Sequence, residues 1–244
     1  MKKIIITLAI ALLASSAQYA QKTDKITISS DIELYKLSDN VYVHVSYFSF
    51  PKFGRFPSNG LVFVNNREAF LMDTPPNDSL TAILYKWLTD SMHLSVKGFI
   101  PNHWHGDCMG GLTFLKSKGI TSYANAKTIA IAKTKGLPVP DREFTDSWII
   151  PFGKTSIQCF YMGAGHSTDN IAVWLPDQKV LFAGCMVKEM SSKNLGNLED
   201  ADITAWPATL QKLKKKFPSV RTVVPGHGAC GGMELIDHTL SLFK

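Results

Sequence analysis

The sequence predicts an α/β fold in which two β-sheets pack face to face and helices cover their outer surfaces. Two observations support this fold: a run of strand-like segments is followed by helical ones, and the second half of the chain repeats that order. With 244 residues, 45% of them hydrophobic and 19% charged, the chain is long enough to bury a substantial core. No low-complexity linker separates the halves, so we expect residues 22–244 to form a single domain.

Strands dominate the start of this domain because hydrophobic and polar residues alternate there in short runs. The expected strands are residues 26–30, 33–37, 41–48, 60–64 and 68–73, with turn-forming residues at 38–40, 57–60 and 65–66. Asp78 or Ser79 can cap a helix that carries Ile83, Leu84, Trp87 and Leu88 on one face. We then expect a strand at 96–101, a helix beginning near Met109, an extended segment at 120–124, a helix at 126–135 and a loop at 136–141.

The second half contains four strand-like runs before its first long helix. The expected elements are strands at 148–152, 156–163, 170–176 and 179–185, a helix at 204–217, a strand at 221–226 and a final helix. Asp202 or Thr204 can cap the long helix, and Pro207 is tolerated in its first turn.

The N-terminus has the order of a secretory signal peptide. Lys2 and Lys3 precede an apolar run at 4–14, and small residues follow at 15–17. Residues 1–17 are therefore the expected signal peptide, with Ala20 or Gln21 as alternative ends. The apolar run is too short to span a bilayer comfortably, so we expect export to the periplasm, or secretion, without stable membrane insertion.

The net charge says little about function. Removing Lys2 and Lys3 with the signal peptide lowers the formal charge from +6 to +4. The lysine-rich run at 212–216 is most simply a solvated helix face, and it lacks the interleaved aromatic residues that would suggest nucleic-acid binding. We expect a monomer with a small-molecule substrate and no nucleic-acid partner.

Metal-binding residue types gather in the stretch NHWHGDC at 102–108, although the chain has only seven histidines and four cysteines. In an extended loop, His103 and His105 project to the same side and can bind one metal ion, and Asp107 continues that alternation. Zinc favours imidazole and thiolate ligands and accepts a carboxylate. The motif HxHxD at the end of an apolar strand therefore indicates a metal site.

Three more candidate ligands lie just beyond strand-like runs. His166 stands in the turn GAGHSTDN, Cys185 ends the run KVLFAGC, and His227 follows the run RTVV. Each one alone is more simply a turn or core residue. The cysteines at 108, 159, 185 and 230 could instead form disulfides in an oxidising compartment, and their spacing does not exclude this.

The order HxHxD, GHSTDN, GC and PGHG resembles the metallo-β-lactamase superfamily, from about Leu34 to the C-terminus. The chain looks like the zinc β-lactamase subclass whose second metal is held by Asp, Cys and His. The runs PNHWHGDCMGG, KGLPVP, TAWP and VVPGHG look especially close to a dizinc carbapenemase of that subclass. Glyoxalase-like relatives carry another histidine where this chain has Cys108. The resemblance implies a four-layer αββα sandwich with the metal site at one edge of the two sheets.

The resemblance also implies the ligands and the reaction. It assigns two Zn²⁺ ions, one to His103, His105 and His166 and the other to Asp107, Cys185 and His227. The implied activity is hydrolysis of the β-lactam amide of penicillins, cephalosporins and carbapenems by a metal-bound hydroxide. Either water or Asp107 would protonate the departing nitrogen.

Further residues are assigned by the same resemblance. Lys188 would pair with the substrate carboxylate and Asn197 would lie near the lactam carbonyl, with a surface lysine and a turn residue as the plain alternatives. Asp73 would steady the metal ligands, or cap a helix or turn. Residues 46–57 correspond to a mobile hairpin over the site, with an ordinary core hairpin as the alternative. Cys108, Cys159 and Cys230 receive no role.

Three other functions remain open at this point. The chain could be another zinc hydrolase of the same fold, such as a lactonase or thioesterase. It could also be a non-catalytic zinc-binding protein, or a binding domain stabilised by disulfides.

Overall fold

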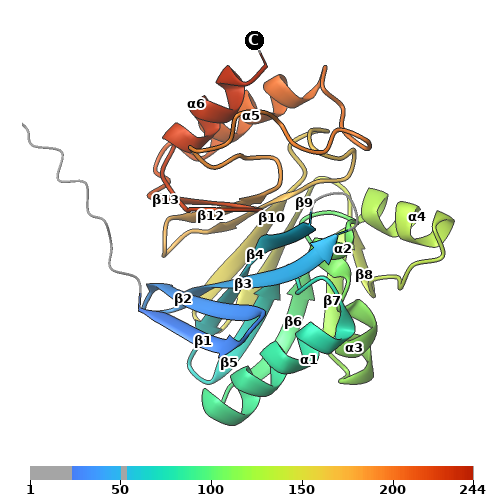
Figure 1. The fold of residues 1–244 in the computed structure, drawn as a ribbon, viewed down its shortest axis with the longest axis vertical. Helices are drawn as coiled ribbons and strands as arrows, with labels where there is room; N and C mark the ends of the chain where they lie inside the picture. Colours follow the sequence, from blue (N-terminus) through green and yellow to red (C-terminus); the bar gives the residue numbers. More distant parts are fainter. Residues whose placement is uncertain (1–23, 51–53, 244) are drawn as a thin grey trace, which may run out of the picture.

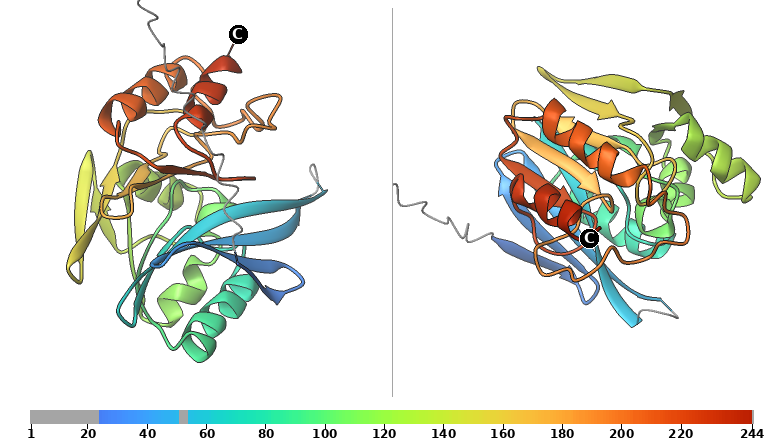
Figure 2. Two further views of the ribbon diagram at one scale, coloured as in Figure 1. Left: turned by 90° about the vertical axis from the view of Figure 1, so that its left-hand side faces the viewer. Right: turned by 90° about the horizontal axis from the view of Figure 1, so that it is seen from above.

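A computed structural model describes residues 24–50 and 54–243 of the chain. Two β-sheets stack face to face, and helices cover both outer surfaces (Figures 1 and 2). The predicted four-layer αββα sandwich is therefore confirmed. The expected signal peptide at 1–17 lies outside the described residues.

Within residues 24–50 and 54–243, the larger sheet has eight strands that lie side by side in chain order. They are β1 (Lys25–Ser29), β2 (Ile32–Ser38), β3 (Val41–Phe50), β4 (Gly54–Asn65), β5 (Glu68–Met72), β6 (Ser95–Ile100), β7 (Thr121–Asn125) and β8 (Arg142–Phe144). The pairs from β1 to β5 are antiparallel, and those from β5 to β8 are parallel. This change of direction brings the carboxyl ends of β5 and β6 to one edge of the sheet.

The smaller sheet, over the same described residues, has five strands in the order β13-β12-β11-β10-β9. They are β9 (Ser147–Phe152), β10 (Thr155–Phe160), β11 (Ala172–Leu175), β12 (Val180–Gly184) and β13 (Thr222–Pro225). Its neighbouring strands are antiparallel except β12 and β13, which are parallel. These last two strands therefore also end at a common edge.

Helices close the sandwich on both sides (Figure 1). They are α1 (Asp78–Lys86), the π-helical turn η1 (Trp87–Ser91), α2 (Gly106–Met109), α3 (Leu112–Ser117), α4 (Ala126–Thr134), α5 (Trp206–Lys216) and α6 (Glu234–Ser241). None of the helices in the described residues has the length and apolar character that crossing a membrane requires.

Three hydrophobic clusters hold the four layers together. Between the sheets, the rings of Phe63 and Phe152 lie 5.4 Å apart, centroid to centroid. Leu84 of α1 and Leu112 of α3 pack against the outer face of the larger sheet. Leu210 of α5 does the same on the smaller sheet, together with residues of α6. Burying each such side chain contributes about 1.5–3 kcal/mol.

Helix capping differs in detail from the prediction. Asn77 caps α1, because its side chain accepts the N–H of Leu80 at 2.9 Å. Asp78 instead accepts the N–H of Phe114 at 2.8 Å and so joins α1 to α3, while Ser79 is not the cap either. Asp202, rather than Thr204, accepts the N–H of Ala205 just before α5.

Two secondary-structure predictions were wrong and one strand was missed. Residues 57–60 are not a turn, because β4 runs straight through them and pairs with β3. Met109 ends α2 instead of beginning a helix. The strand β8 was not predicted, since its three residues are too few to show an alternating pattern and gain their partner only from β7.

Candidate metal centre

The candidate site lies where the parallel strands of both sheets end. The chain leaving β6 carries His103, and the loop between β10 and β11 carries His166. Cys185 follows β12 directly, and His227 follows β13. Because parallel neighbours end at the same edge, these loops meet. The predicted position of the site, at one edge of the two sheets, agrees with this geometry.

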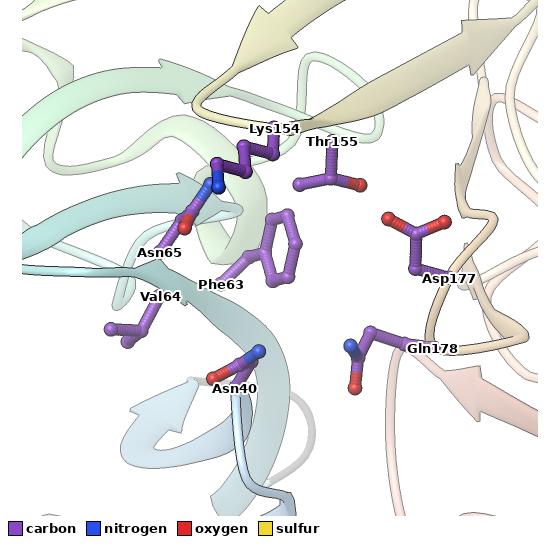
Figure 3. A pocket seen from close by; sticks show the side chains of 8 residues that line it. All are labelled: Asn40, Phe63, Val64, Asn65, Lys154, Thr155, Asp177 and Gln178. Atoms are coloured by element: carbon purple, nitrogen blue, oxygen red, sulfur yellow. The ribbon is translucent and has the colours of Figure 1, made fainter.

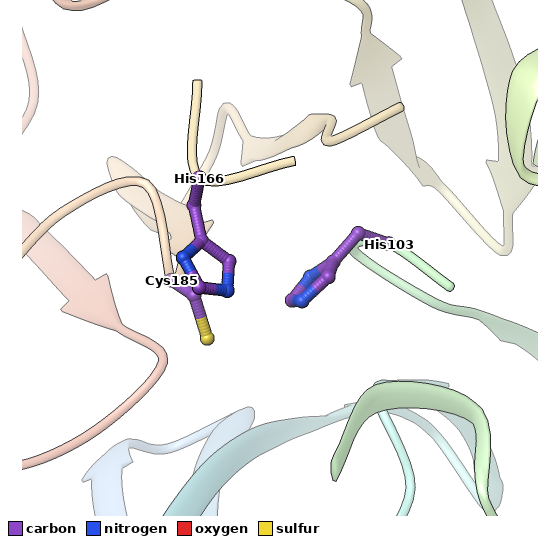
Figure 4. A group of neighbouring side chains, drawn as sticks. All are labelled: His103, His166 and Cys185. Carbon is purple, nitrogen blue, oxygen red and sulfur yellow. The ribbon is translucent and has the colours of Figure 1, made fainter. Parts of the chain in front are cut away.

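The rings of the three histidines predicted for the first metal ion lie close together. Nε2 of His103 lies 2.9 Å from Nδ1 of His105. The ring of His166 lies 5.0 Å from that of His103 and 5.2 Å from that of His105, centroid to centroid. Figure 4 shows His103 and His166 facing a common space, with the Cys185 sulfur beside it.

The predicted trio of Asp107, Cys185 and His227 forms a second group. Nε2 of His227 lies 3.3 Å from the Cys185 Sγ and 3.3 Å from Oδ2 of Asp107. One donor atom from each of the three residues lies within 4.8 Å of the others. All six side chains predicted as metal ligands are thus brought together.

The protonation states of the first group suit metal binding. Burial lowers the pKa of His103 and of His166 well below the usual histidine range, so both rings are neutral and offer a lone pair. Nδ1 of His166 is buried and, within the described residues, has no hydrogen-bond partner. A neutral imidazole is the ligand form that zinc needs.

The second group is ionic. Burial alone would raise the pKa of Asp107, but the hydrogen bond and charge of His227 lower it below its usual range. A hydrogen bond from Cys108 lowers the pKa of Cys185, which favours its thiolate. Although burial opposes it, these two negative neighbours raise the pKa of His227. A divalent cation can therefore replace the His227 proton, and both donor sets fit zinc.

The HxHxD motif is not extended throughout. His105 is the last residue before α2, and Asp107 lies in the first turn of that helix. The alternation expected from His105 to Asp107 is therefore wrong. The helical turn instead places the Asp107 carboxylate beside Cys185 and His227, and one of its oxygens also lies near His103.

Glycines give Cys185 its room. A Cβ on Gly226 would lie only 2.3 Å from the Cys185 Sγ. Gly184 has a φ of +56°, a backbone conformation that glycine adopts without strain. Gly226 of the PGHG motif therefore leaves space for the Cys185 sulfur, and Gly184 allows the backbone conformation that precedes Cys185. Each of these glycines directly precedes a candidate ligand.

Two neighbouring carboxylates hold the predicted ligands in place. Asp73, which is buried, accepts the N–H of Asn102 at 2.5 Å and so fixes the residue before His103. Asp200 lies 2.9 Å from Nε2 of His105, the nitrogen that faces away from His103. Sequence reasoning missed Asp200, since it lies 95 residues from His105 in an irregular loop.

The β3–β4 hairpin holds His227. Nδ1 of His227 lies 2.7 Å from the Pro57 carbonyl oxygen. Asn59 donates its amide to the carbonyl oxygens of Pro225 and Gly228, at 3.0 and 2.8 Å. Sequence reasoning missed Asn59 because the run PSNG is typical of a turn.

The sequence profile of the metallo-β-lactamase superfamily matches residues 53–227. The chain belongs to this superfamily. Over 230 residues it is 54% identical to a metallo-β-lactamase type 2 of Bacteroides fragilis, covering 94% of this chain and 92% of the relative. It is 37% identical to a metallo-β-lactamase type 2 of a Bacillus species, over 94% and 90%. The solved metallo-β-lactamase of Pontibacter korlensis superposes with a TM-score of 0.84 at 35% identity, over 87% of this chain and 98% of that one.

The two residues expected to contact substrate lie on the chain that follows Cys185. Burial lowers the pKa of Lys188, although the negative charges of Cys185 and Asp107 oppose this. Its Nζ lies 5.5 Å from the centroid of the Trp206 ring. Asn197 is exposed, and its side-chain oxygen accepts the N–H of Glu199 at 3.3 Å, as a turn residue would.

All four cysteines are free, so the structure does not support a disulfide framework. Cys108 is buried beside the site, with its Sγ 3.3 Å from Nδ1 of His103. Together with His103 and Asp107 it forms a further possible group of metal donors. Burial raises the pKa of Cys108, which keeps it a thiol and a donor to Cys185.

The β3–β4 hairpin adjoins the candidate site through Phe56 and Pro57, and its expected mobility stays a prediction. Its strands are continuous with the larger sheet, yet Phe48 and Phe56 are exposed, at 37% and 41%. The Phe56 ring lies 4.9 Å from the His227 ring, centroid to centroid. Its tip at 51–53 lies outside the described residues.

A separate pocket of about 170 Å³ lies between the β9–β10 and β11–β12 turns and the end of β4 (Figure 3). Lys154, Asp177 and Gln178 are among the side chains that line it. Its lining contains no histidine or cysteine, so it lacks the metal donors found at the candidate metal centre.

Proposed function

We propose that this chain is a two-zinc hydrolase that opens the β-lactam amide of penicillins, cephalosporins and carbapenems. The observation that carries the proposal is the trio of Asp107, Cys185 and His227 beside three histidines. A thiolate ligand at this place is expected in the β-lactamase subclass and not in the lactonases or thioesterases of the same fold. The similarity to type 2 metallo-β-lactamases over 94% of the chain supports the same reaction.

His103, His105 and His166 would hold one zinc ion, and Asp107, Cys185 and His227 the other. Bound zinc supplies a Lewis acid and makes water a competent nucleophile at neutral pH. With three protein ligands in each set, a coordination position remains open for water or substrate.

Four side chains would act on the substrate itself. The Lys188 ammonium would bind the substrate carboxylate, an attraction that its partly buried position strengthens. Because the Asn197 oxygen is bonded to Glu199, its NH₂ group is left to donate toward the lactam carbonyl. Either water would protonate the departing nitrogen directly, or the ionised Asp107 carboxylate would first take a proton from water and relay it to that nitrogen. Phe56 and its hairpin would cover apolar substituents of the substrate.

We also propose that residues 22–244 act as one exported domain in the periplasm, as a monomer. The order of charged, apolar and small residues at 1–17 supports export.

The test is to purify the mature chain, count its zinc, and assay imipenem and a chromogenic cephalosporin with and without chelator. We expect two zinc ions per chain and hydrolysis that a chelator abolishes and zinc restores. Two bound zinc ions without any β-lactam turnover would contradict the reaction and favour a lactonase, a thioesterase or a non-catalytic zinc protein. Full activity with one zinc ion would contradict the two-zinc centre alone.

A further inference from the structure

The loop that carries His103 and His105 is cross-linked to the loop that carries His166. The N–H of Ile171 donates to the Asn102 carbonyl oxygen at 2.9 Å, and the Asn102 side-chain amide donates to the Ile171 carbonyl oxygen. A third hydrogen bond joins the N–H of Trp104 to Oδ2 of Asp169, at 3.0 Å. The three histidines therefore lie on two loops that are held to each other and not only to the sheets.

Asp169 is the centre of this cross-link. Besides the N–H of Trp104, its Oδ2 accepts the Thr128 hydroxyl at 2.7 Å, and its Oδ1 accepts the Ser167 hydroxyl at 2.6 Å. Trp104 stands between His103 and His105 in the chain, and Ser167 is the residue after His166. One carboxylate thus bonds a residue adjacent to each of the three histidines.

Burying the Asp169 carboxylate costs free energy, which its hydrogen bonds offset. Its side chain is fully buried, and a buried carboxylate is expensive unless donors surround it. Three donors do so here, and hydrogen bonds to a charged acceptor are about twice as strong as neutral ones. Thr128 lies in the first turn of α4, so the same carboxylate also joins both loops to a regular element.

We propose that Asp169 is a positioning residue that sets the spacing of His103, His105 and His166. The inference rests on the proposed function only in that these histidines bind a metal ion. Asp169 touches none of the histidine donor atoms. It acts through Trp104 and Ser167, so its loss should weaken metal binding at the three-histidine site and leave the Asp107–Cys185–His227 site intact.

The test uses Co²⁺ as the probe, because zinc is spectroscopically silent. Metal-free parent chain and the Asp169→Asn variant are titrated with Co²⁺ alone. A thiolate-to-cobalt charge-transfer band reports occupancy at Cys185, and the visible ligand-field bands report the nitrogen-rich site. Asn keeps the size of Asp but removes its charge and one acceptor oxygen.

Asp141 offers a control with similar hydrogen-bond donors at an exposed position. Its Oδ2 also accepts a backbone N–H and a hydroxyl, both from Ser122, at 3.0 and 2.7 Å, and Lys116 is its other partner. Asp141→Asn therefore removes the same kind of hydrogen bonding at a place without candidate ligands. A role that is merely structural would lower the melting temperature of Asp169→Asn and change no cobalt band selectively.

We expect Asp169→Asn to bind Co²⁺ about 10- to 100-fold more weakly at the three-histidine site. The thiolate band should saturate at the same Co²⁺ concentration as in the parent and in Asp141→Asn. An unchanged affinity for both sites, or an equal loss at both, would overturn the proposal.

A second pair of variants keeps the test decisive if Asp169→Asn does not fold. Thr128→Val removes one donor to the carboxylate, and Thr128→Ser retains it. The valine variant should weaken the three-histidine site selectively and the serine variant should not; equal titrations would overturn the proposal. No β-lactam enters these titrations, so a failure of the proposed hydrolysis leaves their outcome unaffected.

Discussion

The three histidines and the Asp107–Cys185–His227 trio lie side by side but are built differently. In the histidine group, His103 and His166 are neutral, and the side-chain oxygens of Asn102 and Asp200 lie within hydrogen-bonding distance of ring nitrogens of His103 and His105. In the trio, two negative side chains surround His227, and the glycine at 226 leaves just enough room for the Cys185 sulfur.

This difference teaches that the two halves depend on metal in different ways. The histidine group is arranged by hydrogen bonds that exist without a cation. The trio offsets part of its negative charge with a proton on His227, so a metal ion that binds there must displace that proton. The first group is thus pre-organised by geometry and the second by charge.

The variant Cys185→Ser should have the largest effect and should separate the two groups of ligands most clearly. Removing the thiolate should empty the second site while the three histidines still bind one metal ion. Because a metal ion supplies several kcal/mol of transition-state stabilisation, we expect β-lactam hydrolysis to fall on the order of 100-fold or more.

Metal counting and steady-state kinetics measure this effect. Cys159→Ser is the control, since it removes another buried free thiol from the core between the sheets. It should lower stability but keep the metal content and kcat/KM. Two metals retained in Cys185→Ser would show that the sulfur is not a ligand.

In the histidine group, Asp200→Ala should weaken metal binding about 10- to 100-fold. The carboxylate holds His105 by Nε2, so its loss frees the ring to rotate. Competition with a chelating dye measures the affinity. Glu199→Ala, which removes an exposed neighbouring carboxylate, should leave it unchanged, and equal losses in both variants would point to a general effect of charge.

The two halves should also respond differently to pH. The raised pKa of His227 means that the metal-free trio holds a proton at neutral pH, which metal binding must release. Affinity at this site should therefore fall about tenfold for each unit of decreasing pH below the His227 pKa. The lowered pKa values of His103 and His166 mean that these rings are already neutral, so the first site should change little over the same range.

Calorimetry in buffers of different ionisation enthalpy counts the released protons. About one proton should accompany the metal ion that enters the trio, and close to none the other ion. Equal proton release at both sites would contradict the assigned charges.

The smallest expected effect on catalysis comes from a substitution in the β3–β4 hairpin. Phe56→Ala removes an aromatic ring that lies against His227 and is 41% exposed. Aromatic contacts contribute about 0.5–1.5 kcal/mol, so KM for substrates with apolar substituents should rise about two- to tenfold while kcat changes less. Trp148→Ala, at an exposed site on β9, is the control. A change confined to kcat would instead indicate that Phe56 acts through the metal ligand.

Local sequence patterns predicted correctly those features that depend on a few neighbouring residues. Alternating runs predicted most strands, and the four motifs predicted six side chains that lie together at one edge of the sheets. They gave no role to Cys108, which forms a further possible donor group with His103 and Asp107. They were less reliable where a distant partner overrides local preference. The run PSNG has the composition of a turn, yet all four of its residues pair with residues 44–47 of β3 and form part of a strand. Asp78 looked like a cap, but Phe114 on another helix takes its side chain.

By itself, the sequence determined the family, the two sheets with their outer helices, and the residue types available as metal ligands, because these follow from periodicity and from motifs a few residues long. Only the tertiary structure decided which other residues hold those ligands in position by hydrogen bonds. Asp169, Asp200 and Asn59 lie 65, 95 and 166 residues from the partners they bond. Hydrogen bonds over such separations depend on how the sheets and loops pack, and no local pattern encodes that packing.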